Sequence, residues 1–398
     1  MAIISKEEYE EKHAYKAPAS DSGYETEEDE DNKPNPWAIH PVDLSTFEKH
    51  VEGKPIFTRE LFQRFINLRQ RALKNKKLNF LVDRDLRNKK RVVWLPPKGN
   101  EDDIFFQYLT TVEIHPDYNF TPCRSPQVAL LHEYNEQFKD HENEHIPCPI
   151  IMCNYRREIS KDHLNKSEMA FWRKKLPSIR RLWTSSSSAQ RLRDTFHSSA
   201  QSCVQIKKIV CIGLGSLRRN ASNRVLNDFQ EALQHFTAFT IASTLDLIYK
   251  AEDPKAPPIQ IIAQDPSYTE KDKILLKEGY TNLTFVDDPE GFLAIDEHTL
   301  VITAFLPWDV PLVQICADLG RPAGFICDKM DLDPEKTHYE SGSRSSPRVV
   351  QMLKWYRRSD FDDHVVEKEM FEDMCGKIRY WLWDMDLFLK PRNEEKEG

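Results

Sequence analysis

Between residues 204 and 330, hydrophobic positions gather into short runs that alternate with stretches of mixed polarity. Five of these runs are nearly continuous and apolar, which is typical of strands that are buried on both faces of a sheet. The intervening stretches repeat an apolar residue every three to four positions, which is typical of amphipathic helices. The predicted strands are Ile206–Gly213, Ile259–Gln264, Leu283–Val286, Leu300–Phe305 and Ala323–Cys327.

Helices are predicted in the four intervals between these strands. They are expected at Asn223–Tyr249, Thr269–Leu276, Glu290–Ile295 and Val310–Leu319. Alternation of strands and helices with short connections requires right-handed crossovers, which make the sheet parallel and cover it with helices. We therefore expect an α/β fold over residues 204–330, with a Rossmann-like, doubly wound parallel sheet in the strand order 3-2-1-4-5.

The N-terminal flank mixes both patterns. A helix is predicted at Phe57–Leu73, and strands are predicted at Arg91–Leu95 and Asp103–Val112. Residues 41–165 are therefore expected to form an α+β N-terminal extension, either as a separate unit or as a lid.

The C-terminal flank is strongly apolar near its end. The spacing of its apolar residues favours helices at Arg348–Tyr356 and Phe371–Leu389, so residues 331–398 are predicted to be a helical segment. For the last helix, packing onto the sheet domain and docking of a partner protein both remain open.

Acidic charge is concentrated near the N-terminus. The chain has 398 residues and a formal net charge of -8, and residues 1–40 hold 11 acidic and 4 basic residues. The run Asp21–Asp31 repels itself and has little to bury, so residues 1–40 are predicted to be a disordered acidic tail. Ser22 and Thr26 lie beside these acids, which leaves open a tail regulated by phosphorylation.

The overall composition excludes several classes of protein. The 12 Gly and 24 Pro residues are too few for a collagen-like or low-complexity chain. No stretch approaches the ~20 apolar residues that span a bilayer, and the first residues do not resemble a secretory signal. We therefore expect a protein of the cytoplasm, the nucleus or both, without a membrane segment, whose 8 cysteines are reduced.

A basic, serine-rich segment precedes the predicted sheet domain. Phe171–Ala200 holds seven basic residues and one acid, and it contains Ser185–Ser188. Residues 166–203 are predicted to be a connector, part helix and part flexible. Nucleic-acid binding through this connector is an alternative that we do not favour, because no aromatic stacking series or zinc framework accompanies the basic residues.

One segment matches a metal motif by its letters alone. His141–His145 has the H-E-x-x-H pattern of zinc proteases, in which two histidines lie one helical turn apart. Pro147 and Pro149 follow almost at once and would interrupt the helix that such a site needs. We interpret the segment as an exposed polar loop and expect no metal site.

Polar residues follow the predicted strands at their carboxyl ends, which meet at one edge of a parallel sheet. Small residues in the turn after the first strand would let a ligand approach the main chain, and the next helix would offer N–H groups to an anion. Acids after the second and third strands would meet ribose hydroxyls and an adenine or amino group. The candidate ligand-binding residues are Gly213, Gly215, Ser216, Asp265, Asp287, Asp288, Pro307 and Trp308.

These residues do not define a reaction. Arg218 stands where a dinucleotide site has its third glycine, and the acids are more typical of a class I methyltransferase. Two interpretations remain open: a site for S-adenosylmethionine or another nucleotide-like ligand, and an inert scaffold whose acids cap the next helices. No catalytic constellation is visible, and Ser216 in its G-x-G-S setting is a turn or cap residue rather than a nucleophile.

Three segments of this region resemble the SRR-type domain (sensitivity to red light reduced). Lys208–Ser216 is similar to the first strand and glycine turn of that family. Gln264–Glu270 resembles its DP-x-aromatic-T element, and Thr299–Pro307 resembles its fourth strand, which ends in an apolar-Pro pair. The resemblance covers about Val204–Met330, and the long flanks suggest a fungal-type member.

The resemblance implies a regulatory protein, with a family role in circadian timing, light signalling and haem metabolism. It supplies no established reaction, so whether the protein is an enzyme stays open. We expect a non-catalytic regulatory protein that senses a nucleotide-like ligand and has protein partners. The alternatives are an S-adenosylmethionine-dependent methyltransferase-like enzyme and a nucleic-acid-binding protein.

Overall fold

The structure of the chain is a computed structural model. It describes residues 41–51, 53–74, 80–84, 90–94, 103–115, 148–155, 166–217, 229–307, 310–340, 342–361 and 381–392. The predicted acidic tail and the His141–His145 segment lie outside these residues.

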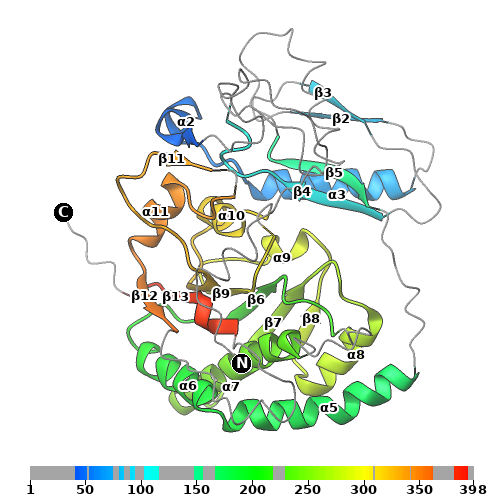
Figure 1. Ribbon diagram of the computed structural model, residues 1–398, viewed down its shortest axis with the longest axis vertical. Helices are drawn as coiled ribbons and strands as arrows, with labels where there is room; N and C mark the ends of the chain where they lie inside the picture. Colours follow the sequence, from blue (N-terminus) through cyan, green and yellow to red (C-terminus); the bar gives the residue numbers. More distant parts are fainter. Residues whose placement is uncertain are drawn as a thin grey trace, which may run out of the picture. The chain divides into compact units, whose positions relative to one another are not determined.

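Seven strands form the central sheet, in the order β12-β13-β10-β9-β6-β7-β8. Five of them run parallel to one another. These five are β6 (Lys208–Ile212), β7 (Gln260–Gln264), β8 (Leu283–Phe285), β9 (Thr299–Thr303) and β10 (Gly324–Asp328). The prediction of an α/β fold with a mostly parallel sheet is confirmed (Figure 1).

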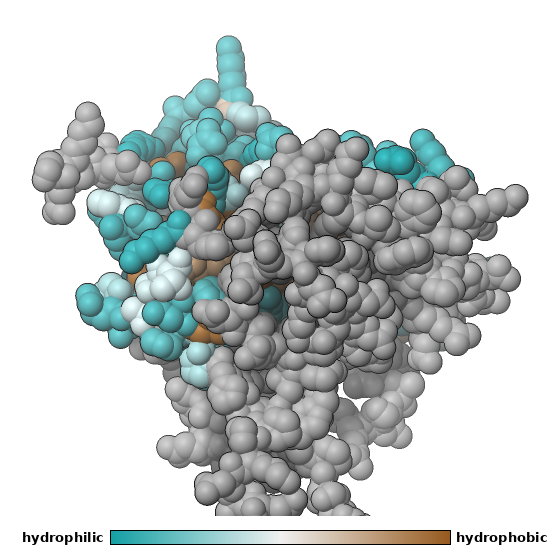
Figure 2. All heavy atoms as spheres, turned by 90° about the horizontal axis from the view of Figure 1, so that it is seen from above, coloured by the Kyte–Doolittle hydropathy of each residue, from teal (hydrophilic) through white to brown (hydrophobic). Residues whose placement is uncertain are grey.

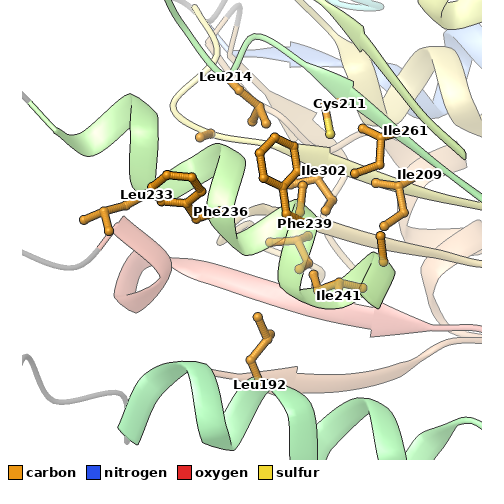
Figure 3. Packing of buried hydrophobic residues seen from close by; sticks show 14 of the residues in the cluster. Leu192, Ile209, Cys211, Leu214, Leu233, Phe236, Phe239, Ile241, Ile261 and Ile302 are labelled. Atoms are coloured by element: carbon orange, nitrogen blue, oxygen red, sulfur yellow. The ribbon is translucent and has the colours of Figure 1, made fainter. Parts of the chain in front are cut away.

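One face of the sheet is covered by α7 (Gln230–Glu252) and by the helix after β7, while α5 (Lys166–Ser185) and α6 (Ser187–Ser199) pack on α7. Ile209 and Ile302 of the sheet belong to the same buried cluster as Phe239 of α7, as Figure 3 shows. The segment predicted to be a connector thus forms two helices that pack against α7. Ser186, between them, caps α6 by accepting a hydrogen bond from Ala189 N at 3.1 Å.

The other face is covered by α9 (Glu290–Leu293), α10 (Leu312–Leu319) and α11 (Pro347–Leu353), together with N-terminal elements. These N-terminal elements are α2 (Leu44–His50), α3 (Arg59–Lys74) and the antiparallel pair β4 (Asp103–Tyr108) and β5 (Ile150–Tyr155). Their aromatic residues join the cluster that holds the sheet residues of this face. The sheet is therefore buried on both faces, as its continuous apolar strands require.

Smaller elements complete the described fold. The helix α8 (Glu270–Gly279) follows β7, and a 3-10 helix, η1, covers Trp381–Asp384. Two further antiparallel pairs lie outside the central sheet. They are β1 (Val42–Asp43) with β11 (His338–Tyr339), and β2 (Phe80–Arg84) with β3 (Lys90–Trp94).

The C-terminal prediction of a helix at Phe371–Leu389 is wrong for its described end. Met385–Leu389 forms a strand, β13, that pairs antiparallel with β10 on one side and with β12 (Arg357–Asp360) on the other. All five residues of β13 are buried. In a short run that is buried on every side, the spacing of apolar residues does not distinguish a helix from a strand. The strands that pair with it then determine its structure.

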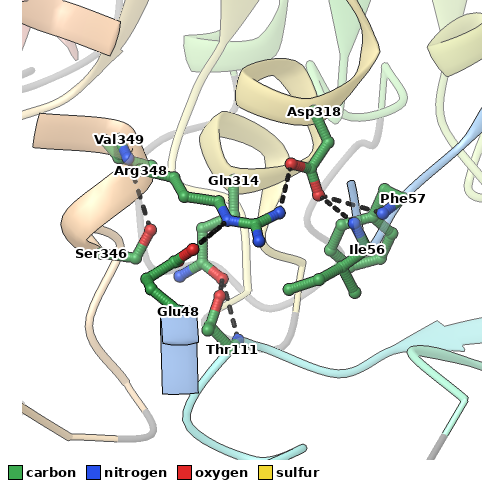
Figure 4. Close-up of polar contacts among 9 residues, drawn as sticks. All are labelled: Glu48, Ile56, Phe57, Thr111, Gln314, Asp318, Ser346, Arg348 and Val349. Atoms are coloured by element: carbon green, nitrogen blue, oxygen red, sulfur yellow. Dashed lines mark hydrogen bonds and ion pairs between the residues drawn. The ribbon is translucent and has the colours of Figure 1, made fainter. Parts of the chain in front are cut away.

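Polar contacts tie the N-terminal elements to the sheet domain at Arg348 of α11 (Figure 4). Its guanidinium Nε lies 2.8 Å from Glu48 Oε1 of α2, and its Nη1 lies 2.7 Å from Asp318 Oδ1 of α10. Asp318 Oδ2 in turn accepts hydrogen bonds from the main-chain N–H groups of Ile56 (2.8 Å) and Phe57 (3.0 Å). The N-terminal residues and the sheet domain therefore share a partly buried charge network.

On the face that Figure 2 shows, the described residues are mainly hydrophilic, with small hydrophobic spots. Of the large apolar side chains, Leu73, Leu247, Ile274, Phe305 and Trp355 are exposed. Among the helices that the structure describes, none combines the length and the hydropathy that crossing a membrane requires.

Candidate functional site

The turn after β6 is built on two glycines in the left-handed region. Gly213 has a φ of 72° and Gly215 a φ of 76°, which other residues adopt at a cost. Space is short as well: a Cβ on Gly213 would lie 2.2 Å from Leu306 Cδ2, and one on Gly215 would lie 2.6 Å from Glu231 Cγ. A side chain at either position would therefore strain the backbone and displace Leu306 or Glu231.

Asp265, at the carboxyl end of β7, holds the glycine turn in place. Its Oδ2 accepts a hydrogen bond of 2.7 Å from the main-chain N–H of Gly215. Its Oδ1 accepts hydrogen bonds from Ser267, at 2.7 Å from the main-chain N–H and at 2.5 Å from the hydroxyl. The carboxylate is thus fixed between the two loops that follow β6 and β7.

A second carboxylate, that of Asp272, is hydrogen-bonded to the end of the glycine turn at Leu217. Asp272 Oδ1 accepts a hydrogen bond of 2.8 Å from Leu217 N, while its Oδ2 accepts from the N–H and hydroxyl of Thr269. Thr269 is the N-cap of α8, and with Asp272 it forms a capping box. Burial raises the pKa of Asp272, against the opposing effect of these hydrogen bonds.

A histidine of α7 lies beside the same loops in its neutral form. His235 Nδ1 lies 2.6 Å from the carbonyl oxygen of Glu231, so Nδ1 donates the hydrogen bond. Nε2 then accepts a hydrogen bond from the hydroxyl of Tyr268, at 2.8 Å. Burial lowers the pKa of His235 to about 4, so the ring carries no charge near neutral pH.

The two acids after β8 have different surroundings. Asp287 is exposed. Asp288 Oδ1 accepts hydrogen bonds from the Tyr108 hydroxyl (2.6 Å) and from Gln264 Nε2 (3.0 Å), and its main-chain oxygen accepts one from Arg69 Nη1 (3.0 Å). Burial raises the pKa of Asp288 to about 6. Side chains from the N-terminal elements thus donate hydrogen bonds to Asp288, which the sequence analysis proposed as a ligand-binding residue.

The loop after β9 lies next to the glycine turn, at the carboxyl ends of the strands. Leu306 is buried against Gly213, whereas Pro307 is exposed. Phe305 has a φ of 49° and a side chain that is 40% exposed. Trp308, and Arg218 of the first turn, lie outside the described residues.

Residues 192–383 match the family model of the SRR1 domain. The chain carries an SRR1 domain. A search of the curated proteins found no match. The matched span begins in α6, ends in η1 and contains the turns described above. It supports a regulatory role at the level of the family.

The SRR1 domain brings only some of the predicted site residues together. Gly213, Gly215 and Asp265 meet in one hydrogen-bonded loop, and Ser216 is buried within it. Asp288 reaches this group only through Gln264, the residue next to Asp265. Whether these residues hold a ligand stays a prediction.

Three thiols of the SRR1 domain are protonated at neutral pH. Burial raises the pKa of Cys211, Cys316 and Cys327 above the ordinary value for a thiol. A protonated, buried thiol is a poor nucleophile and a poor metal ligand. Among the described residues, no three His, Cys, Asp or Glu side chains gather into a cluster that would hold a metal ion.

Sequence reasoning missed several residues that build this part of the SRR1 domain. Asp272 carried a usable signal, because Thr269 and an acid three residues later are the mark of a capping box. Gln264 was visible as a polar residue at the end of an apolar strand. Tyr108 and Arg69 gave no signal, since they reach Asp288 from positions far away in the sequence.

Proposed function

We propose that this protein is a regulatory protein without catalysis of its own, whose SRR1 domain binds a nucleotide-like ligand such as S-adenosylmethionine. The site is the edge formed by the glycine turn Gly213–Leu217, Asp265 and the loop after β9. Regulation would then pass to protein partners that recognise the liganded domain.

The observation that carries this proposal is the place of the glycine turn in the sheet. The chain passes from β6 outward through β7 and β8, then continues on the other side of β6 through β9 and β10. In Rossmann-like sheets, ligands bind outside the carboxyl ends of the strands where the order reverses in this way. Here that point lies between β6 and β9, and the glycine turn follows β6.

The hydrogen bonds of Asp265 leave room for a ligand. Each oxygen of a carboxylate has about two acceptor positions. Oδ1 accepts two hydrogen bonds from Ser267, and Oδ2 accepts one from Gly215 N. The second position of Oδ2 suits a ribose hydroxyl, while the bond to Gly215 keeps the carboxylate and the turn in register.

The state of the ionisable groups supports sensing rather than group transfer. His235 is neutral, and both its ring nitrogens take part in hydrogen bonds. The thiol of Cys211, at the β6 end of this edge, is protonated because burial raises its pKa. These groups lack the reactive form that a nucleophile or a general acid needs near neutral pH.

Calorimetric titration tests the proposal. The full chain is titrated with S-adenosylmethionine, NAD(P), ATP and haem, in the wild type and in Asp265→Ala. We expect binding of at least one nucleotide-like ligand, lost in Asp265→Ala while the circular dichroism spectrum is kept. The matched control is Asp253→Ala, an exposed acid after α7, which should bind as the wild type does. No binding to the wild type would reject the sensing function.

A further inference from the structure

A small cavity, mainly apolar with a few polar side chains in its lining, lies next to the glycine turn, on the far side of Leu306. Its volume is about 10 Å³, which holds one water molecule at most. It lies at the carboxyl ends of β9 and β10. Its lining is Thr303, Leu306, Val310, Pro311, Leu312, Val313, Cys327, Asp328, Ser343 and Arg344.

Thr303 gives this cavity a polar group that lacks a partner. It is the last residue of β9 and is 2% exposed. Among the described residues, its Oγ1 has no hydrogen-bond partner. Buried hydroxyls are nearly always hydrogen-bonded, so this hydroxyl is available to a polar group that enters the cavity.

Opposite charges line the same cavity. Arg344 Nε lies 3.1 Å from Asp328 Oδ2, and the two side chains are 26% and 16% exposed. Arg344 also donates a hydrogen bond from Nη2 to the carbonyl oxygen of Leu306. These contacts use two of the five N–H donors of the guanidinium group. A cavity with a cation, an anion and a hydroxyl matches a group that itself carries both charges.

Leu306 separates this cavity from the glycine turn. Its side chain lines the cavity and also occupies the space where a Cβ of Gly213 would stand. The preceding residue, Phe305, is a bulky residue in the left-handed region, with a φ of 49°. Such strain is uncommon away from functional sites. Leu306, which closes the cavity toward the glycine turn, therefore directly follows the strained residue Phe305.

We infer that Leu306 is a movable plug, and that its displacement joins the cavity to the glycine turn as one binding site. The joined site takes a nucleoside that carries a zwitterionic α-amino acid group. The carboxylate of that group meets Arg344 and the Thr303 hydroxyl, and its ammonium meets Asp328. This inference rests on the proposed function and names the class of its ligand.

Two probes separate the amino acid group from the nucleoside. S-adenosylhomocysteine carries both, whereas 5′-methylthioadenosine keeps the nucleoside and the thioether and lacks the amino acid. Free methionine supplies the amino acid alone. Each probe is titrated calorimetrically into the full-length protein and into three variants: Thr303→Val, Leu306→Ala and the control Leu192→Ala, a buried leucine of α6 on the opposite face.

The site predicts a selective pattern. Thr303→Val should weaken the binding of S-adenosylhomocysteine by about tenfold, because the amino acid group contacts that hydroxyl. The affinity for 5′-methylthioadenosine, which lacks the amino acid group, should not change. Leu306→Ala should raise the affinity for S-adenosylhomocysteine several-fold, because the Leu306 side chain no longer has to move. Leu192→Ala should change neither affinity, although it also removes buried apolar atoms. Free methionine alone should bind more weakly than S-adenosylhomocysteine.

Two other outcomes have different meanings. If the wild type binds both nucleosides equally and Thr303→Val changes neither, the inference is wrong and the proposed function stands. If no probe binds the wild type or Leu306→Ala, the inference is wrong, and the titrations with NAD(P), ATP and haem decide whether the ligand-sensing function stands. Should Leu306→Ala fail to fold, Thr303→Val still decides, since valine keeps the shape of threonine.

Discussion

At the scale of single residues, two buried ionisable groups give the folded state opposite responses to pH. The pKa of Asp288 is raised to about 6 by burial, above its unfolded value, so this group stabilises the fold least when it is charged. Its contribution falls as the pH rises from about 4 to about 6. The pKa of His235 is lowered to about 4, so its contribution falls as the pH drops from about 6.5 to about 4. The net pH profile of the wild type hides both effects.

The variant Asp288→Asn separates them. Asparagine keeps an oxygen that accepts from the Tyr108 hydroxyl and carries no charge to bury. We expect this variant to be more stable than the wild type at pH 7.5, by at most roughly 3 kcal/mol for a shift of about two pKa units. The difference should vanish near pH 4. Urea unfolding at pH 4, 5, 6 and 7.5 measures it, and an equal difference at all four values would contradict the assignment.

The glycine turn offers a second test at this scale. Gly213→Ala places a methyl group both at a φ of 72° and against Leu306, so we expect a loss of about 3 kcal/mol of unfolding free energy. Gly53→Ala is the matched control, because Gly53 has a φ of 64° and open space around it. That control should cost only about 1 kcal/mol. Equal losses in thermal and urea unfolding would show that Leu306 does not press on the turn.

At the scale of elements, hydrophobic patterning located the five parallel strands and most of their helices within a few residues. Continuous apolar runs indicate buried strands when turn residues and amphipathic stretches separate them. The same reasoning failed at β13, since a buried five-residue run looks alike as helix or strand. It also missed the exposed, charged strand β12, whose existence depends on pairing with β13. Partners distant in the sequence decide such elements.

The junction of α2, α10 and α11 depends on one charge network. Arg348 faces both Glu48 and Asp318, and Asp318 is 6% exposed. Arg348→Ala leaves that carboxylate buried without its cation, and we expect a loss of about 3–5 kcal/mol. Arg348→Ala combined with Asp318→Asn should recover part of the loss. Arg357→Ala, an exposed arginine of β12, serves as the control in urea unfolding, and a loss equal to that of Arg348→Ala would argue against the network.

At the scale of the whole molecule, the matched SRR1 span is smaller than the packed unit. It ends at residue 383, two residues before β13 begins, and it leaves out α2, α3 and β4. Yet β13 lies between β10 and β12, and Tyr108 of β4 is bonded to Asp288. Sequence reasoning did not predict these particular contacts, because contacts between distant segments leave no periodic trace.

Truncation tests this dependence. A chain that ends at Asp384 lacks β13, which exposes the edge of β10 and detaches β12 from the sheet. Unpaired apolar strand edges promote aggregation. We expect this chain to be insoluble or to lose its cooperative thermal transition, whereas a chain that ends at Arg392 should melt as the full protein does. A soluble, cooperatively folded product ending at Asp384 would show that β13 is dispensable.

The central claim is that the turn at Gly213–Leu217 binds a nucleotide-like ligand. The most direct measurement is a crystal structure of the full chain grown with S-adenosylhomocysteine. We expect ligand density beside Gly213 and Gly215, with a ribose hydroxyl near Asp265 Oδ2 and Leu306 displaced. Density at another place, or an unchanged turn with Leu306 still against Gly213 at saturating ligand, would contradict it.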